Sequence, residues 1–475
     1  MERTGHIGRV TGYPHLSAGQ ARHGVTRRAA LQGSIWAALG VAGGAGGVLL
    51  AACGATTDQR PAAATLATAS LTYLERGGAA YAELHKARAE AFISLAPGAR
   101  VTGEQMSGTT DEQLAKLVAL AAGGTPPDLA LHLDHGQTVR LAVSGGVLEP
   151  LDAYIARDRQ LNIADIHPEV QAQYRYQKKV YGVAHGISLT SLFVNLDLFR
   201  AAGVAPPPTD WKDGRWTLQA LAEAAAKLTR PNGRGGFDQV GMVAEQMTWN
   251  LNVGNWILGN GGAFLDDLEA PRRCVVDSPA ARDVLELLAD LRQKRRVWAD
   301  GDALEGQLPQ QWFATGRAAL YFGGSFKINA LRAATPANAT WDIAALPRTK
   351  QPVVGLGGSG VSLLAGIKQK DAAWELLRFM VDADYNRLQA KAGLDTPART
   401  SVLAGAEYLG EAPPPASRRV IGDSVQYGKA KNIRAANGPD IETAFNRNAT
   451  AVFNGTMSLG DFAAQTCAAV TPLLT

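Results

Sequence analysis

One stretch, residues 180–204, constrains the fold of this chain more than any other. It begins with a Tyr181-Gly182 turn signal and continues into residues 189–194, an apolar and partly β-branched run of the length of a strand. Polar and apolar residues then alternate before Gly203, and three prolines follow at 206–208. This order of signals predicts that the chain leaves one lobe, crosses a hinge and begins a second lobe.

A Gly-rich stretch at residues 353–360 predicts a return crossing, and its four glycines allow backbone angles that other residues resist. Before the first crossing, strand-like and helix-like patterns alternate. The predicted strands are 70–74, 100–102 and 127–132, and the predicted helices are 81–92 and 111–122. Strands and helices that alternate at this spacing indicate an α/β lobe.

Capping signals predict two helices after the first crossing. Thr217 is a suitable N-cap for a helix that runs to about Leu228. Ser278-Pro279 combines an N-cap with a proline at the first helical position, so it predicts the start of another helix.

The N-terminus carries an export signal. Residues 26–31 resemble a twin-arginine motif, and residues 34–50 form an uncharged, Gly/Ala-rich apolar core. Leu50-Ala51-Ala52-Cys53 matches a bacterial lipobox, which predicts a signal peptide at 1–52, a lipidated Cys53 and a flexible tether over 53–69. We expect acyl chains to hold the protein at the extracytoplasmic face of the cell membrane. The alternative is a transmembrane helix, but the apolar run is short for a full span.

Charge and cysteine content narrow the class of protein. The chain has 47 basic and 43 acidic residues, and five arginines but only one glutamate precede Cys53. The remaining chain is therefore neutral and lacks the basic excess that nucleic-acid binding requires. Cys274 and Cys467 either form a disulfide, as an exported protein permits, or are two buried free thiols, and the sequence leaves both alternatives open.

Several motifs, in order along the chain, resemble those of the sugar-binding branch of the extracellular solute-binding proteins of bacterial ABC importers. The motifs include residues 146–151, Tyr181-Gly182-Val183-Ala184, Val194-Asn195-Leu196-Asp197, residues 313–322 and residues 396–402. Ala184 replaces the usual proline and Leu196 the usual lysine. The resemblance covers most of residues 71–474.

The resemblance implies an α/β fold of the two-lobed, type II periplasmic-binding-protein kind, with a cleft between the lobes. We expect lobe 1 at 70–183 and 356–405, and lobe 2 at 184–355 and 406–475. It also implies capture of a sugar or oligosaccharide by hinge closure and delivery to the permease of an ABC importer. A monomer that is not an enzyme and needs no cofactor or metal is expected.

The family's cleft positions, carried over residue by residue, give a candidate ligand site. A sugar requires aromatic faces beside amide, carboxylate and hydroxyl groups. The candidates are Glu75, Arg76, His132, Asp134, His135, His185, Ser188, Thr190, Trp249, Asn250, Asn252, Phe326, Gly358 and Ser359. For each, the alternative is a core or surface residue with no ligand.

Among these candidates Trp249 leads, because Asn250 and Asn252 beside it would be costly to bury in a dry core. Phe326 stands where the family commonly has a stacking tryptophan. Trp256 and Trp374 are assigned to packing.

Three alternative functions remain. A lipid-anchored hydrolase is disfavoured because the sequence contains no Gly-x-Ser-x-Gly elbow and no His-Glu-x-x-His. Metal binding is disfavoured because the spacing of His132 and His135 does not place both imidazoles on one face of a strand-to-loop segment. The third is a non-sugar solute such as a glycerol phosphate, polyamine or peptide. A phosphate would favour Arg or Lys in the cleft, and Arg76 is the one such candidate.

Overall fold

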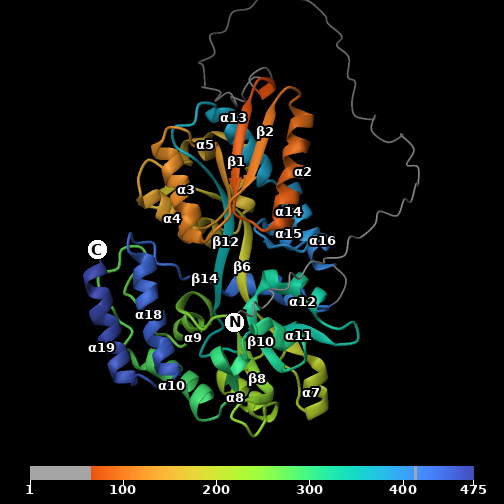
Figure 1. The fold of residues 1–475 in the computed structure, drawn as a ribbon, viewed down its shortest axis with the longest axis vertical. Helices are drawn as coiled ribbons and strands as arrows, with labels where there is room; N and C mark the ends of the chain where they lie inside the picture. The colour runs from red at the N-terminus through yellow and green to blue at the C-terminus, as the bar shows by residue number, and fades with distance from the viewer. Residues whose placement is uncertain (1–65, 411–413, 475) are drawn as a thin grey trace, which may run out of the picture. The chain divides into compact units, whose positions relative to one another are not determined.

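Strand β6 (Val183–Asn195) changes partners along its length and joins two halves of one mixed sheet in this computed structural model, which describes residues 66–410 and 414–474. Residues 183–189 pair antiparallel with β12 (Val354–Leu363). Residues 190–195 pair antiparallel with β10 (Ala318–Gly324) and β11 (Trp341–Ala344). The strand order is β2-β1-β3-β12-β6-β10-β8-β7, and Figure 1 shows β6 and β12 running from one half of the sheet to the other.

The half of the sheet beside β12 contains parallel strands that alternate with helices. β1 (Ser70–Glu75) pairs in parallel with β2 (Arg100–Gln105) and with β3 (Leu129–Asp134). The main helices here are α2 (Ala79–Leu95), α3 (Thr110–Ala122), α4 (His135–Val143), α13 (Lys370–Met380) and α14 (Ala383–Lys391). The strands and helices predicted for residues 70–132 are therefore confirmed, with shifts of a few residues at their ends.

The half beside β10 is built in the same way. β10 pairs in parallel with β8 (Phe237–Ala244). The main helices are α7 (Leu196–Ala202), α8 (Leu218–Lys227), α10 (Pro279–Gln293), α11 (Pro309–Ala314), α18 (Gly438–Phe453) and α19 (Leu459–Val470). Thr217 and Ser278 are the N-caps of α8 and α10, as predicted. Cys274 and Cys467 form a disulfide that ties the segment before α10 to α19, which decides between the two alternatives for these cysteines.

Shorter elements connect these layers. The short helices are α5 (Asp152–Arg157), α6 (Pro168–Gln171), α9 (Gly254–Gly259), α12 (Ile328–Ala334), α15 (Thr400–Leu403), α16 (Ala406–Leu409) and α17 (Arg419–Ser424). The short strands are β4 (Arg175–Tyr176), β5 (Lys179–Val180), β7 (Arg230–Pro231), β9 (Trp298–Ala299), β13 (Thr396–Pro397) and β14 (Gly428–Ala430).

The glycines of the return crossing serve close packing rather than unusual backbone angles. All four lie in the extended strand β12, and none has a positive φ. A Cβ added to Gly360 would lie 2.8 Å from the ring of Tyr174, and one added to Gly182 would lie 2.6 Å from it. The buried Tyr174 hydroxyl donates to the Leu133 carbonyl at 3.2 Å. One ring therefore packs against β3, the start of β6 and β12.

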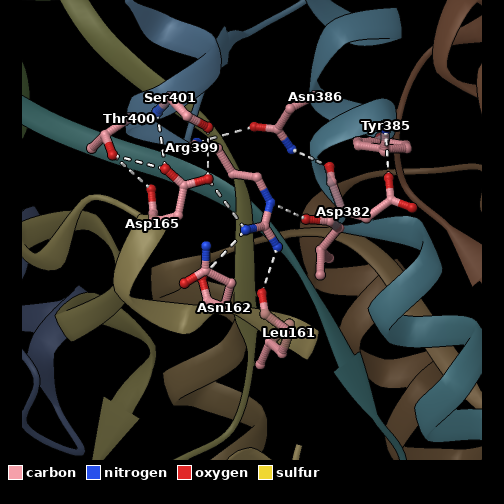
Figure 2. Close-up of polar contacts among 10 residues, drawn as sticks. Leu161, Asn162, Asp165, Asp382, Tyr385, Asn386, Arg399, Thr400 and Ser401 are labelled. Atoms are coloured by element: carbon pink, nitrogen blue, oxygen red, sulfur yellow. Dashed lines mark hydrogen bonds and ion pairs between the residues drawn. The ribbon is translucent and has the colours of Figure 1, made fainter. Parts of the chain in front are cut away.

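Arg399 fixes the segment that follows β13, as Figure 2 shows. Its guanidinium is buried and donates to the carbonyl oxygens of Val381 and Leu161, each at 2.9 Å. It also forms an ion pair with Asp165 at 3.5 Å. These contacts satisfy the buried charge within the protein, so this segment, one of the family-like motifs, has a structural role.

Three further observations bear on the predictions. Strand β6 begins at Val183, earlier than the predicted 189–194, because its first residues find partners in β12 and β13. The predicted signal peptide, Cys53 and most of the tether lie outside the described residues. From residue 66 onward, no described helix is both long and apolar enough to cross a bilayer.

Candidate ligand-binding site

A cavity of about 500 Å³ lies where β6 changes partners. Its wall combines the β3–α4 junction, the middle of β6, the end of β10, the start of β12 and the region around α18. Eight of the fourteen predicted site residues line it, and they are Asp134, His135, Ser188, Thr190, Asn250, Asn252, Phe326 and Gly358. The cavity therefore collects side chains that are distant in the sequence.

The β3–α4 junction forms one wall. Asp134 is the N-cap of α4, and its Oδ1 accepts a hydrogen bond from the Gln137 backbone N–H at 2.9 Å. In turn, the Asp134 backbone N–H donates a hydrogen bond to Gln137 Oε1, which completes a capping box. Arg76 does not line the cavity, but its guanidinium lies 3.6 Å from the Asp134 carboxylate. Burial lowers the pKa of His135, which favours a neutral imidazole at this wall.

Strand β6 supplies two hydroxyl groups. Ser188 and Thr190 are two residues apart on a strand, so their side chains lie on the same face. Thr190 is 2% exposed, and its Oγ1 has no hydrogen-bond partner among the described residues. Leaving a buried hydroxyl unpaired costs about 1–3 kcal/mol. A polar ligand in the cavity would remove that cost.

A single π-helical turn at Trp249–Val253 presents two amides. Asn250 and Asn252 line the cavity, and Oδ1 of each has no partner among the described residues. Trp249 points elsewhere and is fully buried, with its indole N–H donating to the Lys431 carbonyl at 2.8 Å. Its ring packs edge-on against Phe445, with centroids 5.5 Å apart. The placement of Trp249 is therefore that of a core aromatic, and we no longer propose it as a ligand contact.

Phe326 offers an aromatic face at the rim of the cavity. It is 43% exposed and lines the cavity beside Phe322, and the Lys327 ammonium lies 5.2 Å from its ring centroid. Gly324, two residues earlier, leaves room for this ring, because a Cβ added at Gly324 would lie 2.1 Å from a ring carbon of Phe326. Glu245, also at the wall, is neutralised by Lys327 at 2.8 Å.

Lys431, Asn432 and Glu442 complete the wall, and none of them was predicted. β14 pairs in parallel with the start of β12, which brings the two residues after it to the cavity. A three-residue strand has too little periodicity to be predicted, and Glu442 lies in a helix with no motif around it. The polar Lys431-Asn432 pair, a few residues before the start of α18 at Gly438, is the sequence signal that could have indicated this region.

Both charged groups at this end of the wall are held by protein partners. The buried Lys431 Nζ donates to the Leu251 carbonyl and to Asn255 Oδ1, each at 2.6 Å, and burial keeps its pKa well below its usual range. Glu442 accepts hydrogen bonds from the Asn250 amide and from the Ile433 backbone N–H, the latter at 3.2 Å. Burial raises the pKa of Glu442 to about 7.

The predicted residues that do not line the cavity are Glu75, Arg76, His132, His185, Trp249 and Ser359. Four of these, all except Arg76 and Trp249, lie in a buried polar cluster beneath the cavity's β3–β12 side. His85 links Glu75 to Tyr385, with its Nε2 2.8 Å from the Tyr385 hydroxyl. Ser359 donates to the buried Asp395 at 2.7 Å. These contacts are internal to the protein and leave the four residues without a route to a ligand in this conformation.

Two histidines of this cluster are held neutral. Burial lowers the pKa of His132 to about 3, and it lowers the pKa of His185 well below the ordinary value. The His132 ring lies 4.0 Å from the Tyr81 ring and 5.5 Å from the His185 ring, measured between centroids. His135, in contrast, lines the cavity. Within the described ranges, no group of three His, Cys, Asp or Glu side chains has the geometry to hold a metal ion.

Comparison with known proteins gives a consistent picture. A family model described as bacterial extracellular solute-binding protein matches residues 87–412. A protein of Brucella abortus is 23% identical over 318 residues, which are 66% of this chain and 71% of that protein.

Solved structures share the fold. An ABC substrate-binding protein of Listeria monocytogenes, solved in complex with cycloalternan, superposes with a TM-score of 0.72 at 22% identity, over 86% of this chain and 99% of that one. The sugar-binding protein MalE of Xanthomonas citri superposes with a TM-score of 0.71 at 20% identity, over 85% of this chain and 97% of that one. The two-lobed, type II fold expected from the sequence is thus confirmed, whereas the expected limits of the lobes remain a prediction.

Proposed function

The chain belongs to the bacterial extracellular solute-binding proteins, and from this premise we propose that it captures a sugar or oligosaccharide and delivers it to the permease of an ABC importer. The family is one of extracellular binding proteins, and we expect this chain to act outside the cytoplasm as a binding protein rather than as an enzyme. The ligand class, the permease partner and the anchoring at Cys53 are parts of the proposal.

The chemistry of the cavity wall carries the proposal. Thr190, Asn252 and Asn432 are buried, neutral hydrogen-bonding side chains at the wall, and each has at least one polar atom without a partner among the described residues. Phe326 adds an exposed aromatic face. Hydroxyl groups satisfy neutral amides and hydroxyls, and the C–H face of a sugar ring packs on an aromatic ring. This combination favours a polyhydroxylated, uncharged ligand.

The charged groups at the wall argue against an anionic ligand. Lys431 already donates to two protein oxygens, and Arg140 forms an ion pair with Asp111 at 2.8 Å. These are the only Lys or Arg side chains that line the cavity within the part of the chain that the structure describes. A phosphate ester gains most of its affinity from charge-assisted bonds to free Arg or Lys. The wall has no such free group to offer among its described residues.

Capture is proposed to proceed by hinge closure. β6 and β12 are the strands that connect the two halves of the sheet, and the cavity lies beside them. Closure of the lobes around a ligand excludes water and strengthens polar contacts in the site. The lipid anchor on Cys53 would keep the protein, as a monomer, near its permease.

A ligand screen tests the proposal. A ligand that binds only the native state raises the melting temperature by mass action. We expect a mono- or oligosaccharide to raise it, and glycerol phosphate, polyamines and peptides to leave it unchanged. If a phosphate, amine or peptide raises the melting temperature while no carbohydrate does, the sugar assignment is wrong. Product analysis of the same mixtures tests the hydrolase alternative, because release of smaller sugars would contradict a pure binding role.

A further inference from the structure

Three polar side chains from separate segments line the cavity, and Glu442 is bonded both to Asn250 and to the backbone of Ile433, the residue after Asn432. Asn250 comes from the π-helical turn, Asn432 from the loop after β14, and Glu442 from α18. All three line the cavity. We call these three residues the anchor subsite.

The carboxyl group of the anchor subsite is fixed in place by the protein. Glu442 Oε1 accepts from the Ile433 backbone N–H at 3.2 Å, and its Oε2 accepts from Asn250 Nδ2. Because a carboxylate oxygen has more than one lone pair, each oxygen keeps capacity for a second donor. Asn250 is oriented by the same bond, and its Oδ1 has no partner among the described residues.

The amide of Asn432 is the least satisfied group at the wall. Its side chain is 5% exposed, and neither its Nδ2 nor its Oδ1 has a hydrogen-bond partner among the described residues. Buried amides in native proteins are nearly always hydrogen-bonded, and an unpaired one destabilises the fold. Both polar atoms of this amide have almost no exposed surface, so a ligand contact requires the side chain to turn toward the cavity that the residue lines.

The charges that face Glu442 come from two directions. Lys431 lies beneath it and favours the ionised carboxylate, whereas Asp134 at the β3–α4 junction opposes it. Burial is the largest influence and raises the pKa of this carboxyl to about 7. The anchor subsite thus combines neutral amides with a carboxyl group that changes its charge near neutral pH.

We propose that Asn250, Asn432 and Glu442 fix one ring of the sugar by an adjacent pair of hydroxyl groups. The inference rests on the proposed function and names the part of the ligand that this end of the cavity holds. One hydroxyl donates to the Glu442 carboxylate and accepts from Asn432 Nδ2, and the other donates to Asn250 Oδ1. An ionised carboxylate accepts such bonds more strongly than a neutral acid does, so Glu442 sets the pH at which the ring is held.

Isothermal titration with the sugar identified by the screen tests this inference. We expect Asn432→Ala to weaken sugar affinity by about tenfold or more, because a ligand hydroxyl loses its partners. The melting temperature without ligand should not fall, because Asn432 makes no hydrogen bond to the described protein. Asn454→Ala is the matched control: this exposed asparagine is the C-cap of α18, does not line the cavity and should leave affinity unchanged.

The pH profile tests the role of Glu442. Wild-type affinity should rise between about pH 6 and pH 8 as the carboxyl ionises, and Glu442→Gln should bind more weakly and with a flat profile. Asp440→Asn, an exposed acid in the first turn of α18, should keep the wild-type profile.

The outcomes separate this inference from the proposed function. If the wild type binds no sugar, the proposed function fails in the screen. If the wild type binds a sugar and folded Asn432→Ala and Glu442→Gln bind it equally well, the proposed function stands and the anchor subsite is wrong. Should Asn432→Ala fail to fold, Asn432→Ser serves in its place, because it replaces the amide with a smaller polar group. Unchanged sugar affinity in that variant would overturn the inference.

Discussion

Asn250 and Glu442 lie 192 residues apart in the sequence, and the amide Nδ2 of the first donates a hydrogen bond to Oε2 of the second. The bond links the π-helical turn to α18 at the wall of the cavity. Because each side chain orients the other, their contributions to ligand binding should not be independent.

A double-mutant cycle measures this dependence. Asn250→Ala and Glu442→Gln should each weaken sugar binding, and the double variant should lose less than the sum of the two single losses, by about 0.5–3 kcal/mol. The measurement is titration calorimetry of the three variants and the wild type. Additive losses would show that the two residues act separately.

The indole of Trp249 should matter for stability rather than for affinity. Trp249→Ala removes a fully buried ring and should lower the free energy of unfolding by about 3–5 kcal/mol, as measured by urea unfolding. Trp249→Phe keeps most of the packing but loses the bond to the Lys431 carbonyl, so its loss should be smaller. A folded, equally stable Trp249→Ala protein that no longer binds ligand would return this residue to the site.

The rim aromatic should show the opposite behaviour. Phe326→Ala removes an exposed ring, so stability should change by less than about 0.5 kcal/mol while sugar affinity falls by about three- to tenfold. Leu388→Ala is a matched control, since Leu388 is 42% exposed and does not line the cavity. Equal affinity of both variants and the wild type would exclude stacking on Phe326.

Stability should fall with acidification because of two buried histidines. The pKa of His132 is lowered to about 3, and that of His185 is also lowered, so the unfolded chain binds protons at a higher pH than the native one. The stabilisation is complete above the unfolded value of about 6.5 and is lost progressively as the pH falls from there toward 3.

Thermal unfolding at a series of pH values checks this sign. His132→Gln and His185→Gln should each flatten the decline between about pH 6 and pH 4. His167→Gln is a useful comparison, since His167 is half-buried, does not line the cavity and has a pKa that burial also lowers. A wild-type protein whose melting temperature is constant over this range would contradict the prediction.

Local signals in the sequence predicted most of the fold. The N-caps at Thr217 and Ser278 mark helix starts because one side chain satisfies backbone N–H groups within three residues, which needs no tertiary context. The length of β6 was not predictable in the same way. Its first half is a strand because β12 lies beside it, and the partner is more than 160 residues away.

Several of the predicted residues that line the cavity stand at a strand end or in a crossing, as Asp134, Ser188 and Thr190 do. Trp249 was predicted to contact the ligand, but its side chain is buried in the core, whereas the neighbouring Asn250 lines the cavity. Both residues lie in one helical turn, and the periodicity of the sequence does not show which of them faces the cavity. Asn432 was not predicted, because the parallel pairing of β14 with β12 brings it to the cavity wall and this pairing is a long-range contact.

The ring of Tyr174 has a consequence for motion. The ring packs against Gly182 and Gly360, and its hydroxyl donates a hydrogen bond to the Leu133 carbonyl. Tyr174 therefore contacts three neighbouring strands at one point. If the lobes close around a ligand as proposed, we expect the two connecting strands to bend on the side of Tyr174 that faces the cavity. The phenol ring would then set the position of the hinge.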